Sequence, residues 1–133
     1  MAVKISVAVR NARLDAIETA IGVSAVLKIR TGAPPTDIVD ADSGTVLATI
    51  SLPSDWMAAA AAGAKAKSGT WQDAAADADG TAGHFRIYAS DGSTQHIQGT
   101  CGAGAEDLVL DNAVLATGQT VTITSFTLTD GNA

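Results

Sequence analysis

One cysteine and two histidines are the side chains with the greatest potential for nucleophilic chemistry. Cys101, His84 and His96 would form a Cys–His pair if one imidazole could take the proton of the thiol. Such a pair also needs a polar group that orients the imidazole, and no Asp or Asn stands at a recognisable spacing for that role. We therefore predict no catalytic residues and expect the chain not to be an enzyme.

A predicted hairpin decides where these three residues lie. Asp91-Gly92 separates two runs of alternating polarity and is typical of a type I′ turn, in which both central residues need a positive φ. A loop centred there pairs residues whose numbers sum to 183, so that His84 faces Gly99. Residues directly opposite share a face of the sheet. This register predicts His84 and His96 on opposite faces, with Cys101 on the side of His84 at the frayed end of the hairpin.

The acidic residues do not form a convincing metal site. The segment 77–80 (Asp-Ala-Asp-Gly) is weakly similar to a calcium-binding EF-hand loop. When it is aligned on Gly80, Ala75 takes the first ligand position and Arg86 the twelfth, where an oxygen donor and a glutamate are required. Two histidines on opposite faces would also make a poor transition-metal site. We predict no metal and no cofactor. Three more carboxylates are expected to lie scattered on a polar loop: Asp37, Asp40 and Asp42.

Glycines and tryptophans offer two further candidate sites. Residues 99–104 contain three glycines but no following helix and no lysine, so they do not form a phosphate cradle and are predicted to be part of a flexible loop. Trp56 and Trp71 are a large share of the bulky side chains in a chain with 4% aromatic residues. Trp71 lies in a predicted strand and is expected in the core. For Trp56 the core and an interface remain equal alternatives.

A helix is predicted over residues 6–21, with Ser6 as its N-cap and Gly22 just beyond its end. Apolar residues recur at helical spacing on the face expected to be buried: Val7, Leu14, Ile17 and Ile21. Charged residues are expected to turn away from that face: Arg13, Asp15 and Glu18. Small residues form a second stripe that would pack within the domain or between subunits: Ala8, Ala12, Ala16 and Ala20.

After Gly22 the period of the hydrophobic pattern changes from helical to alternating, which indicates strands. Residues 53–80 are predicted to form a loop or a short helix through the alanines at 58–62, followed by a strand at about 65–76. The inward parity of the last strand shifts near Thr124-Ser125, which indicates a β-bulge. The other strands are expected at 25–30, 45–52, 84–90, 94–100, 107–110, 113–116 and 120–129.

Short strands separated by turn signals predict a mainly β fold, an antiparallel β-sandwich or jelly roll with one N-terminal α-helix. We expect one domain over residues 1–133, with the helix and arm in 1–22 and the sandwich in 23–133. The chain has 27 alanines, and Leu, Ile, Val and Phe together number 29 of 133, about 22%. A thin core, completed by neighbouring subunits, fits this composition better than a large enzyme core.

Charge is distributed unevenly along the chain. Residues 1–30 carry five basic and two acidic residues, or +3, whereas residues 31–133 carry three basic and twelve acidic residues, or −9. The net charge of −6 argues against direct binding of nucleic acid or of an anionic membrane. The basic N-terminal portion is either a solvated helix face or a surface for an acidic partner or sister subunit. A single cysteine and the absence of a signal-peptide pattern predict a protein made in a cytoplasm.

Several segments resemble small uncharacterised proteins of tailed bacteriophages and prophages. The resemblance lies in residues 80–88 (Gly-Thr-Ala-Gly-His-Phe-Arg-Ile-Tyr), 104–110 and 116–126, and in the segments 1–4, 16–22 and 52–57 (Leu-Pro-Ser-Asp-Trp-Met). It implies a virion structural protein, similar to the cement or decoration proteins of icosahedral capsids. The partners it implies are the major capsid protein and the chain itself, as a dimer or trimer, on the capsid exterior. Alternatives are a minor tail, neck or fibre-associated protein, or a carbohydrate-binding sandwich that uses an exposed Trp56.

Overall fold

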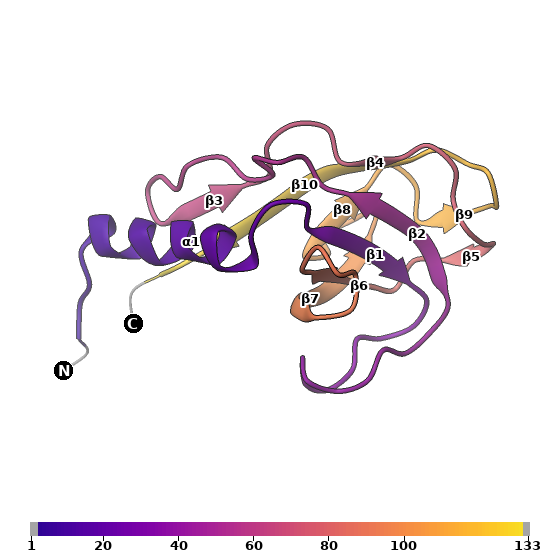
Figure 1. Cartoon of the computed structure of the whole chain (residues 1–133), viewed down its shortest axis with the longest axis horizontal. Helices are drawn as coiled ribbons and strands as arrows, with labels where there is room; N and C mark the ends of the chain where they lie inside the picture. The colour runs from indigo at the N-terminus through magenta and orange to yellow at the C-terminus, as the bar shows by residue number, and fades with distance from the viewer. Residues whose placement is uncertain (1–2, 132–133) are drawn as a thin grey trace.

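The computed structural model describes residues 3–131 and shows one helix at the end of a curled β-sheet (Figure 1). The mainly β fold class with one N-terminal helix is therefore confirmed. The elements are α1 Val7–Ile21, β1 Val26–Arg30, β2 Val46–Ser51, β3 Ala64–Ala66, β4 Gln72–Asp73, β5 Gly80–Thr81, β6 His84–Tyr88, β7 Gln95–Gly102, β8 Leu108–Leu110, β9 Val114–Leu115 and β10 Val121–Thr129.

Seven strands follow one another in the main sheet, in the order β2-β1-β6-β7-β8-β10-β3, and β4 pairs with β10 as the eighth. A second sheet of two strands joins β5 to β9. Almost all the pairs are antiparallel, as expected for a sandwich. The exception is the short parallel pair β7–β8, which joins Cys101 to Leu108 and Gly102 to Val109. Curling of the main sheet brings its inner face around one core.

Local signals at both ends of α1 have the predicted effect. The Ser6 side chain accepts a hydrogen bond from the amide of Val9, and Gly22 leaves the helix with a positive φ of 86°. The prediction for the faces of the helix is partly wrong. Leu14 and Ile21 are buried as expected, but Val7 is exposed. The alanine stripe (Ala8, Ala12, Ala16 and Ala20) is also exposed, so it does not pack within the domain.

The prediction that Asp15 and Glu18 turn away from the body is wrong. Three side chains spaced along one helix face accept hydrogen bonds from backbone amides of the segment 57–63. Glu18 accepts from Met57, Asp15 from Ala60 and Asn11 from Gly63. The alanine-rich segment therefore lies against α1 in an irregular, non-helical conformation. Alanine's helix propensity is weak compared with these tertiary contacts, so the alternative of a short helix over 58–62 is also wrong.

The strands agree with the alternating pattern, and the bulge is where the parity shift indicates it. Ile123 pairs with Leu110 but Ser125 pairs with Val109, so one extra residue enters β10 at Thr124. In residues 53–80 the structure has two short strands, β3 and β4, in place of one strand over 65–76. Trp71 stands just before β4, and its buried indole donates to the carbonyl oxygens of Ser68 and Trp56.

Aromatic rings form the centre of the core. The ring centroids of Trp56 and Trp71 are 6.0 Å apart, those of Trp71 and Phe126 are 5.7 Å apart, and Phe85 meets Phe126 edge to face at 5.5 Å. Both tryptophans are fully buried, which settles the alternatives for Trp56 in favour of the core. Its indole donates to the carbonyl of Gly22 at the end of α1, so this ring also fastens the helix to the sheet.

Candidate functional site

The β6–β7 hairpin corrects the predicted register around the histidines and the cysteine. A four-residue loop between Ala89 and Thr94 replaces the two-residue turn but keeps the predicted pairing beside it, since Tyr88 faces Gln95. A β-bulge beside His96 then shifts the register by one, so that His84 faces Thr100, not Gly99. Because His96 is the extra residue at this bulge, the register gives it no partner, and the placement of the two histidines on opposite faces stays a prediction.

The three candidate nucleophilic residues do not come together. Cys101 follows Thr100, so it points to the core, on the face opposite His84; the prediction that it shares the side of His84 at a frayed end is wrong. Burial, with a smaller effect from the charge of Glu106, raises the pKa of the Cys101 thiol to about 12. His96 is exposed and lies about 13 Å along the strand from Thr100, the residue opposite His84.

Each carboxylate of the segment 77–80 holds a neighbouring strand or turn. Asp77 accepts from the hydroxyl of Thr49 at 2.8 Å, and Asp79 accepts from the amide and hydroxyl of Thr117 at 2.7 and 3.0 Å. The hydrogen bonds from Thr117 lower the pKa of the Asp79 carboxyl. Within residues 3–131, no three His, Cys, Asp or Glu side chains lie close enough together to hold a metal ion.

The glycine-rich segment 99–104 is more ordered than predicted. β7 continues through Cys101 and Gly102, and both pair with β8. Beyond Gly102 the chain turns, and the side chain of Glu106 accepts from the amide of Gly104 at 2.8 Å. The Glu106 carboxylate thus takes up a loop amide that a phosphate cradle would have to offer to its ligand.

Among residues 3–131 there is no helix with the length and the apolar composition that a membrane span requires.

A buried charged cluster on the outer face of the sheet was missed by the sequence analysis. Arg86 is completely buried, although it was considered only for its failure as a metal ligand. Its guanidinium donates to the Asp42 carboxylate at 3.0 Å, to the Gln98 side chain at 3.0 Å, and to the carbonyls of Asp40 and Asp37 at 2.8 and 3.2 Å. The residues predicted as scattered loop carboxylates therefore converge on one arginine.

Two neighbours complete this cluster. Arg30 donates to Asp42 at 2.9 Å, and the Tyr88 hydroxyl donates to the same carboxylate at 2.7 Å. Burial acts to raise the pKa of Asp42, but the hydrogen bond from Tyr88 and the charges of Arg30 and Arg86 outweigh it and lower that pKa. Burial raises the pKa of Tyr88. One nitrogen of Arg86 binds Gln98 of β7, and the Gln98 amide in turn donates to the carbonyl of Pro35 in the loop at 2.8 Å. The cluster therefore clamps the loop of residues 31–45 onto β1, β6 and β7.

An alternating pattern explains how the cluster forms and offers the signal that could have found it. Arg30 and His84 are cross-strand partners, and Arg86 and Tyr88 follow His84 at two-residue intervals, so all four share the outer face. His84 Nδ1 donates to the carbonyl of Gly32 at the start of the loop at 2.9 Å. Polar residues at alternate positions of a strand usually face solvent; here they are buried because a loop covers them.

The basic N-terminal region is largely engaged within the chain. Arg13 forms an ion pair with Asp130, and Arg10 donates to the carbonyl of Asp130 at 3.0 Å. Lys28 donates to the carbonyl of Gly92 at 3.0 Å. The acidic partner of the helix is thus the end of β10. This contact, together with the pairing of Lys65 with Asp15 and Glu18, fixes α1 against the sheet.

Apolar side chains remain exposed at the N-terminal end of the molecule. Val3 is 80% exposed, and Val7 and Val9 at the start of α1 are 45% and 50% exposed. The alanine stripe continues from Val9 along one side of the helix, whereas Val7 lies on the side of Leu14 and Ile21. We call residues 3, 8, 9, 12, 16 and 20 the arm–helix surface. Isolated exposed valines are common, but Val9 lies on the same side of α1 as the exposed alanine stripe, and such a helix face suits contact with another protein.

Comparison with known proteins identifies no relative. No known protein family, no curated protein sequence and no solved structure matches this chain.

Proposed function

We propose that the protein is a structural component of a bacteriophage virion, a capsid decoration protein that binds the outside of the shell and stabilises it. It would be made in the host cytoplasm, associate with itself as a dimer or trimer, and contact the major capsid protein. The observation that carries the proposal is the arm–helix surface, where Val9 is exposed beside an exposed alanine stripe and Val3 is exposed ahead of the helix. The resemblance of several segments to small phage proteins supports a phage particle as the assembly to which this surface binds.

The use of the charged groups supports a binding role over a chemical one. Arg30, Arg86, Asp42 and Lys65 all hold one part of the chain to another. A decoration protein needs this kind of rigidity, because it must keep its contact surface in one shape when the shell is under internal pressure. Trp56 lies in the core, so the carbohydrate-binding alternative has lost the exposed tryptophan on which it depended.

Phage particles that carry the gene allow a direct test. Particles would be stripped of the protein, rebound with purified variants, and heated while DNA release is followed. Val9→Asp is expected to abolish rebinding and to leave the particles as heat-sensitive as stripped ones, because burial of an unpaired carboxylate is unfavourable. Val114→Asp is the control, since Val114 is 64% exposed on β9 at the other end of the molecule (Figure 1).

The copy number per particle tests the location. Hundreds of copies are expected for a shell protein, whereas a handful would reassign it to the neck or tail. Equal heat stability of stripped and intact particles would overturn the stabilising role, and absence of the protein from purified particles would overturn the virion assignment.

A further inference from the structure

The main sheet has a gap between β7 and β10. The short strand β8 separates them, and it pairs with β7 only at Cys101 and Gly102. On its other side β8 pairs with β10 only as far as Phe126. Both neighbours continue past the start of β8, through residues 97–100 of β7 and 127–129 of β10. No described strand lies between these two stretches.

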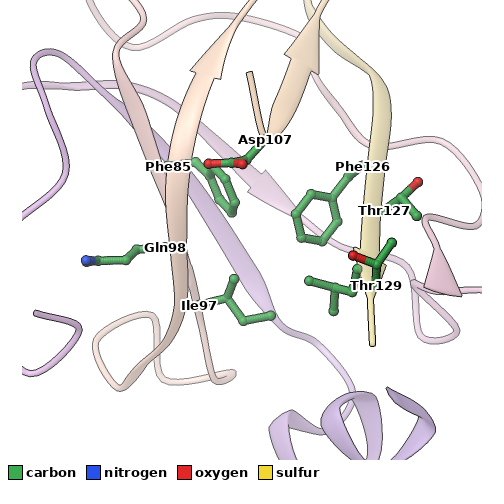
Figure 2. Close-up of a pocket in the computed structure, with 8 residues that line it drawn as sticks. Phe85, Ile97, Gln98, Asp107, Phe126, Thr127 and Thr129 are labelled. Carbon is green, nitrogen blue, oxygen red and sulfur yellow. The ribbon is translucent and has the colours of Figure 1, made fainter. Parts of the chain in front are cut away.

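The gap opens as a groove of about 340 Å³ (Figure 2). Phe85 and Phe126 form its inner end, and Ile97 extends into the space between the strands, whereas Gln98 points to the far side of β7. Ile97 and Leu128 are only half-buried, although both pack against the core. The groove thus has an apolar floor between two strand edges.

Where β8 fills it, the gap is one strand wide, because β8 pairs with β7 on one edge and with β10 on the other. Two strands that flank a single missing strand lie about 9.5 Å apart, twice the spacing of neighbouring strands. A strand that continued β8 backwards would run parallel to β7 and antiparallel to β10, and would place alternate side chains on the apolar floor. Addition of an extended peptide to a strand edge is a recurring mode of protein recognition, because backbone hydrogen bonds supply affinity and alternate side chains supply specificity.

Residues 3–6, which we call the arm, have the sequence that such a strand requires. Val3 and Ile5 alternate with Lys4 and Ser6, so one face is apolar and the other polar. The arm precedes α1 and belongs to no helix or strand, and the backbone of Ser6 is extended, with φ −63° and ψ 154°. Four extended residues span about 13 Å, the length of the four-residue stretch of β7 that borders the gap.

Two further observations indicate that the occupant comes from another copy. Val3 is 80% exposed, so in the single chain its side chain does not fill the groove. The charges are also complementary, because the arm brings Lys4 while Asp107, which accepts from the amide and hydroxyl of Thr100, lines the groove and Glu106 precedes it. Reciprocal exchange of identical elements closes a symmetric dimer without a new fold.

We propose that the arm of one copy inserts between β7 and β10 of a second copy, with Val3 and Ile5 on the apolar floor and Lys4 facing outward. This rests on the self-association included in the proposed function, and it names the segment and the groove that would carry it. Exchange of the arm is measured on the isolated protein. If the isolated protein does not associate in this way, attachment to a capsid can still be tested separately.

The oligomeric state of the full chain tests the proposal by analytical ultracentrifugation over a range of concentrations. The unmodified chain is expected to associate, and Val3→Asp to raise the dissociation constant at least tenfold. Val39→Asp is a matched control, because Val39 is also 80% exposed but lies on the 31–45 loop. Hydrogen exchange should show slower exchange of residues 3–6 in the dimer than in the monomer.

A mixing experiment distinguishes strand exchange from other interfaces. Leu128→Lys blocks the groove but keeps the arm, and Thr129→Arg, at an exposed groove position, replaces it if Leu128→Lys does not fold. The groove variant alone and Val3→Asp alone should each remain monomeric. A mixture of the two should form a heterodimer, because the groove variant supplies an intact arm and the Val3→Asp chain supplies an intact groove. A monomer at every concentration, association that survives both variants, or a monomer whose arm is protected would each overturn the proposal.

Discussion

Arg86 shows how a single buried charge can organise a loop. Each of its three nitrogens has an oxygen partner, and three of its four acceptors belong to the segment 37–42. A planar guanidinium can meet this fork of acceptors, whereas an ammonium is a point charge on a flexible chain. Hydrogen bonds from the closed loop therefore offset the free-energy cost of removing Arg86 from water. The order of the loop consequently depends on this one side chain.

Replacement of Arg86 by lysine is expected to release the loop although the charge is kept. Loss of the bonds to Gln98 and to the two carbonyls should reduce the free energy of unfolding by about 2–4 kcal/mol. Urea denaturation would measure the loss, and hydrogen exchange should be faster in residues 36–45. Arg13→Lys is the control, because the Arg13 side chain is half-exposed and should tolerate the change. Equal losses in the two variants would contradict a specific role for the fork.

At the scale of elements, α1 is held to the sheet mainly by charged and polar contacts. Lys65 of β3 is buried between two carboxylates of the helix, 2.7 Å from Asp15 and 3.0 Å from Glu18. Burial acts to lower the pKa of Lys65, but the hydrogen bonds to both carboxylates outweigh it, so the pKa is raised. Lys65 remains charged and fastens the helix to β3.

Lys65→Met should detach α1 while the sheet remains folded. The two helix carboxylates would lose their shared partner, at a cost of about 1–3 kcal/mol, below that of a fully buried pair because Asp15 is half-exposed. Amides of α1 should then exchange faster than those of β6. Lys67→Met is the matched control two residues away, where the ammonium binds only the Gly69 carbonyl and the Trp71 ring. Unchanged exchange in α1 would show that apolar contacts alone hold the helix.

These elements also show which parts of the fold were predictable. The cap at Ser6, the end of the helix at Gly22 and the bulge at Thr124 each depend on neighbours in sequence, and all three are correct. The face of α1 and the clamp around Arg86 depend on segments 40 or more residues away. No periodicity within the helix or within the 31–45 loop reports such partners, so those predictions failed.

The β6–β7 hairpin was predicted correctly in part. Asp91-Gly92 correctly marks its position, and the pairing of Tyr88 with Gln95 beside the loop is the predicted one. The Asp91 carboxylate accepts from the amides of Ser93 and Thr94, which favours a longer loop than the two-residue turn. A dipeptide signal thus located the turn without fixing its length. The β-bulge beside His96, which no dipeptide signals, shifts the pairing beyond it by one residue and places Cys101 on the core face, opposite His84.

Across the whole molecule, carboxylates join segments that are distant in sequence. Asp15 binds β3, Asp42 binds β1 and β6, Asp79 binds the turn after β9, and Asp130 binds α1. In each case the partners lower the pKa of the carboxyl. The apolar core organises the sheet, while these carboxylates attach its periphery, so acid should affect the two parts differently.

Acid should therefore release the periphery before the core unfolds. A carboxyl whose pKa is lower in the folded state stabilises the protein above its ordinary pKa of about 3.8, and this contribution is lost as pH falls through the folded value. The urea midpoint should be constant from pH 7 to about 5 and fall steeply below about 4.

Hydrogen bonds from Thr94 lower the pKa of Asp91 to about 2, so Asp91→Asn should make the midpoint less sensitive to pH between about 4 and 2. Tryptophan fluorescence would report the core, and exchange of α1 and of residues 31–45 the periphery. Simultaneous loss of both signals at every pH would contradict this order, because it would mean that the carboxylates and the core form one cooperative unit.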